Sequence, residues 1–224
     1  MLDLKTVHGL CVDVDCLIMG PLQNNVYLIS DDEAALVVDP TENAEAILSA
    51  LDGKKLAAIV LTHGHWDHTG AAAELRRLSG APVIAGVADA DQIESPSDIG
   101  TSRVSDPCPV DVRVKTGDVV RAGGMQWKVL ETPGHSPGSI CLFIVPPFGN
   151  HADGLPVLVS GDTLFKGTFG RTDLGGGSMR EMGKSMKRLA ALPDDVAVLP
   201  GHNDLTTIGN ERSTFALFGD EPEE

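Results

Sequence analysis

Long hydrophobic runs are absent from this chain of 224 residues. Its apolar stretches, such as residues 57–61 and 140–145, are much shorter than the ~20 residues that a membrane-spanning helix needs. The first five residues, Met-Leu-Asp-Leu-Lys, also lack the basic start and the apolar core of a signal peptide. We therefore expect a cytoplasmic protein that does not bind membranes.

Basic residues are scarce as well. The chain has 17 lysines and arginines against 32 aspartates and glutamates, which gives a net charge of −15. This excess of acid opposes binding to nucleic acids and to anionic membranes, because both require clustered positive charge. It also repels an anionic small molecule at long range, but salt screens that repulsion within about 8 Å. The composition therefore argues against a nucleic-acid partner.

Cysteines and aromatic residues are few, with four cysteines and a single tyrosine, Tyr27. The cysteines are Cys11, Cys16, Cys108 and Cys141, and none belongs to a CxxC pair. Cys11 and Cys16 are five residues apart, so on one flat strand they would face opposite sides. We expect buried free thiols, as is usual in a cytoplasmic protein.

Metal-binding residue types are concentrated at residues 62–68, Thr-His-Gly-His-Trp-Asp-His, directly after an apolar run that predicts a buried strand. His63 and His65 alternate as strand residues do, so both can project to one side. Asp67 and His68 would lie at the start of a helix and face a second point nearby. Imidazole and carboxylate groups together suit zinc, manganese or iron.

Three further residues of the same types follow apolar runs downstream, each with a glycine beside it. His135 lies in Pro-Gly-His-Ser-Pro-Gly, Asp162 in Gly-Asp-Thr and His202 in Pro-Gly-His. Glycine allows the backbone to turn tightly without a clash of its Cβ atom. Ligands placed on loops over a rigid sheet are typical of a catalytic site.

In this order, HxHxDH, PGH, GDT and a second PGH resemble the motifs of the metallo-β-lactamase fold superfamily. The resemblance runs from about residue 20 to about residue 209. It implies an α/β fold of the αββα type, in which two mixed sheets lie face to face with helices outside and the metals at one edge. With 42% hydrophobic residues, the chain is long enough to form a single domain over residues 1–224.

The resemblance also implies two adjacent divalent metals, for which we expect zinc, with iron and manganese as alternatives. Seven residues would hold them: His63, His65 and His135 at the first position, Asp67, His68 and His202 at the second, and Asp162 as the bridge. Water held between two metals becomes a hydroxide nucleophile near neutral pH, and the metals stabilise the oxyanion that it forms. We therefore expect hydrolysis, with Asp67 orienting the nucleophile and serving as a candidate base.

Within the superfamily, residues 162–173 are similar to the glyoxalase II group, particularly its short bacterial type, which hydrolyses thioesters such as hydroxyacyl-glutathione. Full-length glyoxalase II carries a C-terminal helical domain that binds glutathione, but only 22 residues follow His202, so we do not expect that domain here. A lysine and a tyrosine that hold glutathione in those enzymes correspond to Arg171 and Asp173. Arg171 is our candidate contact for a substrate carboxylate, because its planar fork matches one. The alternative is an ion pair between Arg171 and Asp173.

Other functions stay open. Persulfide dioxygenases share this scaffold and use one Fe(II) held by two histidines and an aspartate, which here would be His63, His135 and Asp162. Residues 166–169 lack the Arg-Gly-Cys that precedes Gly-Arg-Thr-Asp in those enzymes, which favours a hydrolase. A lactonase is disfavoured because no tyrosine lies near the metal motifs. The bridging aspartate argues against a true β-lactamase, and the complete ligand set argues against a metal-free binding module.

Apolar periodicity predicts the remaining elements. We expect strands at residues 12–19, 26–29, 35–38, 57–61, 82–85, 126–131, 140–145, 157–159 and 196–199, and helices at 44–51, 70–79 and 178–192. In the last helix, Met179, Met182, Met186 and Leu189 would form one stripe facing the core. Residues 87–114 are interpreted as a loop or lid over the site. A small thioester or ester is the expected partner, and both a monomer and a homodimer fit the sequence.

Overall fold

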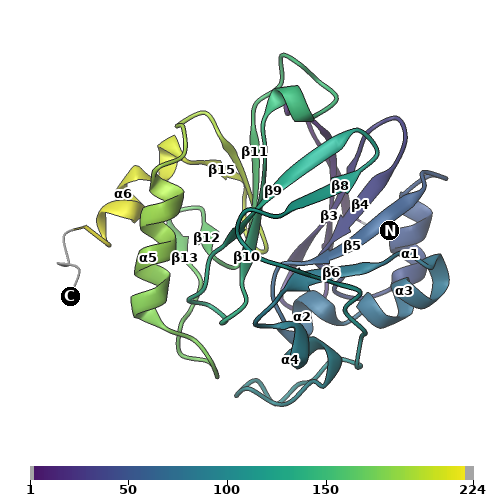
Figure 1. Ribbon diagram of the computed structural model, residues 1–224, viewed down its shortest axis with the longest axis horizontal. Coiled ribbons are helices and arrows are strands. Elements are labelled where there is room, and N and C mark those ends of the chain that lie inside the picture. Colours follow the sequence, from purple (N-terminus) through teal and green to yellow (C-terminus); the bar gives the residue numbers. More distant parts are fainter. Residues whose placement is uncertain (1–2, 220–224) are drawn as a thin grey trace.

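Two β-sheets packed face to face, with helices on both outer faces, form the framework of the protein (Figure 1). The computed structural model describes residues 3–219. One sheet has seven strands and the other has six, and a separate hairpin has two. This arrangement is the αββα sandwich that the motifs imply.

The strands of the first sheet follow the order of the chain from one edge to the other. They are β1 (Asp3–Val7), β2 (Asp13–Met19), β3 (Asn24–Ser30), β4 (Ala35–Val38), β5 (Leu56–Leu61), β6 (Val83–Gly86) and β7 (Val112–Val114). Neighbours are antiparallel from β1 to β4 and parallel from β4 to β7. The carboxyl ends of β4, β5 and β6 therefore meet at one edge, where the loops that follow them can build a site.

The second sheet is arranged around a parallel pair. Its order across the sheet is β15 (Thr206–Thr207), β14 (Ala197–Pro200), β11 (Val157–Gly161), β10 (Ile140–Ile144), β9 (Met125–Glu131) and β8 (Val119–Ala122). The strands β11 and β14 run parallel, so the residues after them emerge side by side. The hairpin of β12 (Leu164–Phe165) and β13 (Thr168–Phe169) follows β11 directly.

The helices cover the two outer faces. They are α1 (Ala44–Ala50), α2 (Trp66–Thr69), α3 (Ala72–Ser79), α4 (Ala90–Glu94), α5 (Met179–Ala190) and α6 (Arg212–Ala216), with 3₁₀ turns at Pro146–Phe148 and Gly209–Glu211. The first four lie on the side of the seven-stranded sheet, and α5 and α6 lie on the opposite side (Figure 1).

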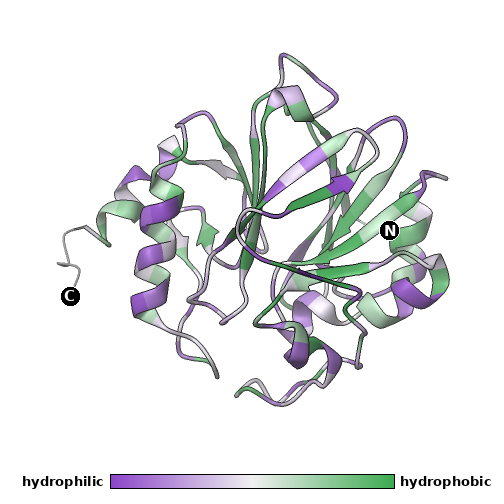
Figure 2. Cartoon of the chain, in the orientation of Figure 1, coloured by the Kyte–Doolittle hydropathy of each residue, from purple (hydrophilic) through white to green (hydrophobic). Residues whose placement is uncertain are grey.

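Hydrophobic side chains fill three layers between these elements. Trp127 and Tyr27 are fully buried between the two sheets. Ile47 of α1 packs in the layer beneath the first sheet, and Met182 and Leu189 of α5 pack in the layer beneath the second. Figure 2 shows the same division, because the central strands are hydrophobic whereas α5 alternates between hydrophilic and hydrophobic residues. A buried side chain of this size contributes about 1.5–3 kcal/mol, so both outer helix layers are anchored by apolar burial.

The predicted core elements are confirmed to within a few residues, and the differences have local causes. The helix expected over residues 70–79 starts only at Ala72, because the shorter α2 precedes it. Met179 does not belong to the buried stripe: it is 53% exposed because it occupies the first turn of α5. Residues 87–114 contain α4 and β7 and are thus not only a loop. The outer strands β1 and β8 were not predicted, because exposed residues interrupt their apolar pattern.

All four cysteines are buried and none is in a disulfide, as predicted. Burial raises the pKa of Cys11, Cys108 and Cys141 to about 11. At pH 8 only about one such thiol in a thousand is then ionised, and the thiolate is the reactive form. We expect the folded protein to leave these three cysteines unmodified by Ellman's reagent over minutes, whereas the unfolded chain should titrate all four. Rapid reaction of the folded protein would contradict the buried placement.

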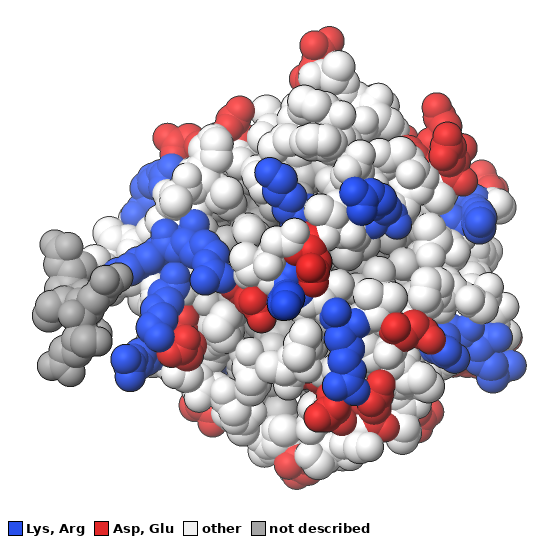
Figure 3. Space-filling view, viewed as in Figure 1, with Lys and Arg blue, Asp and Glu red and all other residues white. Residues whose placement is uncertain are grey.

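The described part of the chain, residues 3–219, has no helix long and apolar enough to cross a membrane. On the face seen in Figure 3, acidic and basic side chains are interspersed, and basic ones gather over α5. Within α5, Lys184 donates to Glu181 at 2.8 Å, so part of this positive charge is neutralised locally.

Candidate metal centre

The segments that carry the predicted ligands meet where strands of both sheets end. Each ligand lies just after a strand or in the following short helix: His63 and His65 after β5, Asp67 and His68 in α2, His135 after β9, Asp162 after β11 and His202 after β14. The N–H of Ile140 donates to the carbonyl of Thr62 at 2.9 Å, which joins the loops of the two sheets. His63 and His65 lie in the loop between β5 and α2, which is the turn at the end of a strand that the sequence indicated.

The first group consists of His63, His65 and His135, whose ligand atoms all lie within 4.8 Å of one another. Their ring centroids are 4.4 to 4.8 Å apart. The Nε2 atom of each ring is buried and has no hydrogen-bond partner among the described residues. Unpartnered buried nitrogens are unfavourable on their own, but three that converge on one point suit a bound cation.

The second group consists of Asp67, His68 and His202. The Nε2 atoms of the two histidines are 3.2 Å apart, and Oδ2 of Asp67 lies 3.4 Å from each of them. Donors bound to one tetrahedral zinc ion at about 2.0–2.1 Å are about 3.3 Å from one another. These three atoms therefore have the spacing of ligands to a single metal.

Asp162 lies between the two groups. Its Oδ1 is 3.3 Å from Nε2 of His68. Its Oδ2 is 3.5 Å from Nε2 of both His135 and His202. The carboxylate thus faces ligands of both positions, which is the placement that a bridging group needs.

Hydrogen bonds at the far ring nitrogens orient three of the histidines. The Nδ1 atoms lie close to fixed oxygens: His68 at 2.9 Å from Oδ2 of Asp39, His135 at 2.7 Å from the carbonyl of Arg171, and His202 at 3.2 Å from the carbonyl of Leu22. Because a carbonyl or carboxylate oxygen can only accept, Nδ1 donates in each pair. The lone pair of a neutral ring is then on Nε2, which faces the cluster.

The charges in the cluster shift pKa values in opposite directions. Burial lowers the pKa of His65 to about 3. Burial opposes ionisation of Asp162, but the charge of His68 outweighs it and holds the pKa of that carboxyl well below its usual range. At His202 burial is outweighed by hydrogen bonds to Asp162 and Asp67, which raise its pKa to about 9. The ionised carboxylates thus attract positive charge to this point, as a cation site requires.

The residues present fit two divalent cations. The buried Nε2 atoms of the first group and Oδ1 of Asp162 have no hydrogen-bond partner in the described structure. Imidazole nitrogens and carboxylate oxygens in this mixture accept zinc, iron or manganese. The donor set therefore supports a metal centre and leaves the identity of the metal open.

Asp39 supports the second group although the motifs do not contain it. Its Oδ1 accepts from the N–H of Thr62 at 2.7 Å, and its Oδ2 accepts from the hydroxyl of Thr62 at 2.6 Å and from His68. Asp39 also lies near His63 and His68. Because these hydrogen bonds occupy both of its carboxylate oxygens, Asp39 orients metal ligands and is not a metal ligand itself. It follows the apolar run of β4 directly, which is the pattern that revealed the other ligands.

Asp89 joins the two ligand loops of the first group. It is 3% exposed and accepts hydrogen bonds from the N–H of Gly64 at 2.8 Å, the hydroxyl of Ser136 at 2.6 Å and the N–H of Gly138 at 2.6 Å. Gly64 separates His63 from His65, and Ser136 follows His135. Asp89 lies in the segment interpreted as a lid, and no pattern in the sequence signalled this contact.

A model of the metallo-β-lactamase superfamily matches residues 19–202, a range that contains all seven candidate ligands. The chain belongs to this superfamily. It is 41% identical to an uncharacterised protein of Aquifex aeolicus, over 90% of this chain and 95% of that one. It is 31% identical to the hydroxyacylglutathione hydrolase GloC of Haemophilus influenzae, again over 90% of this chain and 95% of that protein.

Solved structures of metallo-β-lactamase proteins agree with this assignment. The chain is similar to the B3 metallo-β-lactamase BLEG-1, with a TM-score of 0.81 at 33% identity over 92% of this chain and 99% of that one. It is similar to TTHA1623 in a di-iron-bound form, with a TM-score of 0.74 at 35% identity over 88% of this chain and 96% of that one. It is also similar to ETHE1 of Myxococcus xanthus, with a TM-score of 0.71 at 28% identity over 90% of this chain and 82% of that one.

Arg171, the predicted contact for a substrate carboxylate, is exposed and paired with Asp173, whereas the metal ligands face the centre of the cluster. Its Nε and Nη2 atoms donate to the two carboxylate oxygens of Asp173 at 2.7 and 2.8 Å, and both side chains are exposed. Only its backbone carbonyl contacts the cluster, through His135. The ion pair that was the alternative for Arg171 is therefore formed, and its guanidinium must exchange Asp173 for a substrate carboxylate if it binds one.

A second arginine has its guanidinium against the segment that carries His65 and Asp67. The guanidinium of Arg103 stacks over the ring of Trp66, 4.7 Å from its centroid, and Trp66 lies between His65 and Asp67 in the chain. A narrow crevice beside them is lined by His65, Trp66 and several residues of the loop after α4, among them Ile99, Thr101 and Arg103 itself. No salt bridge joins Arg103 to a carboxylate within residues 3–219, so the donors at its edge are available.

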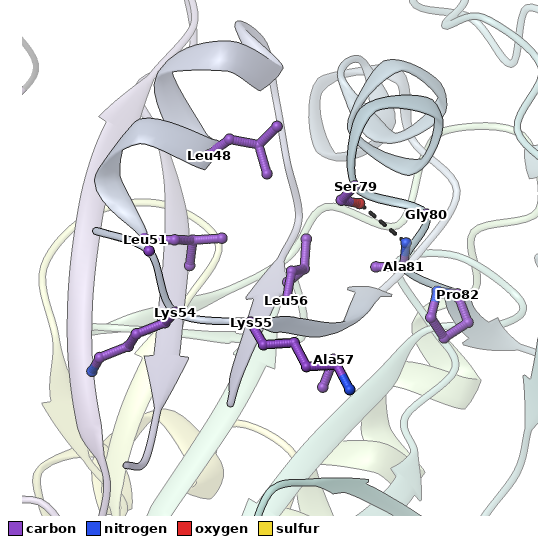
Figure 4. Close-up of a pocket in the computed structure, with 11 residues that line it drawn as sticks. Leu48, Leu51, Lys54, Lys55, Leu56, Ala57, Ser79, Gly80, Ala81 and Pro82 are labelled. Carbon is purple, nitrogen blue, oxygen red and sulfur yellow. Dashed lines mark hydrogen bonds between the residues drawn. The ribbon is translucent and has the colours of Figure 1, made fainter. Parts of the chain in front are cut away.

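A larger surface groove of about 490 Å³ lies elsewhere (Figure 4). It is formed where α1 and α3 end and β5 begins, with Leu48, Lys55 and Ser79 among its lining residues. His63 follows the opposite end of β5. None of the candidate ligands lines this groove, so it is separate from the metal centre.

Gly201, next to His202, has no room for a side chain. A Cβ atom there would lie 2.3 Å from Oδ1 of Asp162 and 2.8 Å from Cε1 of His68. We expect Gly201→Ala to displace both groups and to weaken metal binding by at least about tenfold, measured by competition with a chelator. The control is Gly183→Ala in α5, where the nearest atom is 3.5 Å away and metal affinity should not change. Equal affinities of the two variants would contradict the close packing of the site.

Proposed function

We propose that the protein is a two-metal hydrolase that cleaves a small thioester, with hydroxyacyl-glutathione as the candidate class. The observation that carries the proposal is the position of Asp162, which faces the ligands of both groups. Two divalent metals held there would supply an acidified water as nucleophile and would polarise the substrate carbonyl. The similarity to GloC over almost the full length of both chains supports the substrate class.

Asp67 is the residue that we assign to orienting the nucleophile. Burial opposes ionisation of Asp67, but the neighbouring His68 outweighs it and holds the pKa of the carboxyl far below its usual range. Asp67 is therefore ionised near neutral pH, and its carboxylate can accept a hydrogen bond or a proton from water. In the structure, Nδ2 of Asn24 donates to Oδ2 of Asp67 at 2.9 Å.

We assign recognition of the substrate's negative charge to Arg103. Arg103→Met is expected to raise KM for an anionic thioester roughly fivefold, which corresponds to the ~1 kcal/mol of an exposed charge pair, and to leave kcat unchanged. Arg171→Met should change KM less, because Asp173 already occupies its guanidinium. Steady-state kinetics with an anionic and a neutral thioester test both variants. A larger effect of Arg171→Met would return the assignment to Arg171.

A mononuclear Fe(II) persulfide dioxygenase is the second candidate, and a lactonase or other ester hydrolase is a third. Nε2 of His135 lies 3.5 Å from Oδ2 of Asp162. Together with His63, these residues form the set of two histidines and one aspartate that a mononuclear iron site needs. The similarity to TTHA1623, whose structure is in a di-iron-bound form, supports iron as an alternative metal. The complete second group of ligands favours the hydrolase.

Two assays on untagged protein separate these functions. Hydrolysis of S-lactoylglutathione by protein that contains zinc, or a mixture of divalent metals, would support the thioester hydrolase. Persulfide-dependent oxygen uptake by protein with one iron would support the dioxygenase. If the protein binds two metals but has neither activity, the proposal of a hydrolytic site remains and glutathione is rejected as the part of the substrate that is recognised.

We also propose a cytoplasmic location, because four buried free cysteines suit a reducing compartment. The proposed partner is a small thioester or ester, with no role for nucleic acid or membrane. Light scattering on the purified protein would distinguish a monomer from a homodimer.

A further inference from the structure

Asn24 is a fully buried polar residue at the metal centre that no motif assigns. It begins β3, pairs with Met19 of β2 and forms an isolated bridge with His202. The neighbouring N–H of Asn25 donates to the carbonyl of Gly201 at 2.8 Å. Asn24 has no exposed surface, and the backbone on both sides of it is held in place.

The side-chain amide of Asn24 lies against the three ligand atoms of the second group, at the spacing of a further ligand. Its Nδ2 lies 2.9 Å from Oδ2 of Asp67, 3.3 Å from Nε2 of His68 and 3.4 Å from Nε2 of His202. Those three atoms are themselves 3.2 to 3.4 Å apart. Four donors around one ion at about 2.0–2.1 Å have this spacing. The end of the Asn24 side chain therefore lies at a ligand position of the second group.

The two ends of the amide differ in what they can do at this position. An amide nitrogen carries donors only, whereas the amide oxygen has lone pairs for a metal. The Oδ1 of Asn24 is buried and has no hydrogen-bond partner among the described residues. A half turn about the last side-chain bond exchanges oxygen and nitrogen without changing the shape of the side chain. A cation in the second position attracts the oxygen and repels the N–H groups.

We propose that Asn24 binds the second metal through Oδ1, as a neutral ligand beside Asp67, His68, His202 and Asp162. This inference rests on the two-metal site proposed above and not on its substrate. An amide oxygen is a harder donor than imidazole, so it shifts the preference of this position from zinc toward manganese. Asn24 thereby contributes to the choice and retention of the second metal.

Three forms of the full chain test the proposal: the natural protein, Asn24→Ala and Asn24→Asp. Binding of the second Zn²⁺ and Mn²⁺ ions is measured by titration against a chelator, and Co²⁺ absorption reports the number of ligands. Asn24→Ala should lower affinity at the second position by at least about tenfold, more for Mn²⁺ than for Zn²⁺, and leave the first position unchanged. Circular dichroism of the metal-free proteins verifies that each variant folds.

Asn24→Asp separates a ligand from a hydrogen-bond donor. The new carboxylate still offers an oxygen to the metal, but it cannot donate a hydrogen bond to Asp67 and repels it. If Asn24 is a metal ligand, Asn24→Asp should keep the affinity of the second position. If Asn24 is only a hydrogen-bond donor to Asp67, that affinity should fall as in Asn24→Ala. Loss in both variants, or no loss in Asn24→Ala, would overturn the proposal. The proposed function is tested separately. If the protein binds two metals and shows the predicted Asn24 effects but does not hydrolyse thioesters, Asn24 is a ligand and the proposed substrate is rejected. A natural protein that binds only one metal would overturn both.

Discussion

Replacing Asp162 with alanine is expected to lower bound metal from about two ions per chain to at most one and to lower thioester hydrolysis by at least about a thousandfold. The carboxylate faces His68, His135 and His202 at 3.3 to 3.5 Å, so its removal leaves both ligand groups without their shared negative charge. Metal analysis by mass spectrometry and hydrolysis rates on the same preparation measure the two effects.

The control for Asp162→Ala is Asp153→Ala, which removes an exposed aspartate from a loop that carries none of the candidate ligands. This variant should keep both metals and full activity. An Asp162→Ala protein that retains two metals and more than about a tenth of the activity would reject the bridging assignment, because the loss would then be below the ~1.4 kcal/mol of a tenfold change in rate.

Asp89→Ala is expected to cause the largest loss of stability among substitutions outside the ligand set. Alanine leaves the N–H groups of Gly64 and Gly138 and the hydroxyl of Ser136 without their buried acceptor. Each buried unsatisfied donor costs about 1–3 kcal/mol, so the loss of an acceptor for three donors should lower the free energy of unfolding by roughly 3–9 kcal/mol. This is a large share of the ~5–15 kcal/mol that stabilises a typical domain.

Urea unfolding of the metal-free protein measures this loss without the contribution of bound ions. Asp89→Asn is the matched variant, since its amide oxygen still accepts part of the hydrogen bonds, and its loss should be about half as large or less. The first group of ligands should also bind metal less tightly in Asp89→Ala, because the loops of His65 and His135 are no longer joined. Equal stability of Asp89→Ala and the natural protein would show that solvent or another acceptor replaces the carboxylate.

The metal ligands could be predicted from the sequence because each one belongs to a local pattern. His63 and His65 stand together after an apolar strand, and Asp162 and His202 each follow a strand and a glycine. The supporting residues have no comparable pattern, because their role depends on contacts between distant segments. Asp89 meets Gly138 across 49 positions, and nothing near either residue in the sequence indicates that contact.

The strands of the core could be predicted for a similar physical reason. A strand buried on both faces, such as β4, reads as a continuous apolar run. The edge strand β1 has exposed side chains, and β12 and β13 have only two residues each, so neither apolar run nor alternation marks them. Asp39 could have been found, since it follows β4 directly as the ligands follow their strands. Asn24 could not, because it is the first residue of its strand and does not follow one.

The most direct test of the two-metal account is the number of metal ions per folded chain, counted by native mass spectrometry on untagged protein after exposure to excess zinc, iron or manganese. The two ligand groups and the shared Asp162 predict a main species with two ions. A protein that binds one ion or none under every condition would contradict the dinuclear centre and the hydrolytic function built on it.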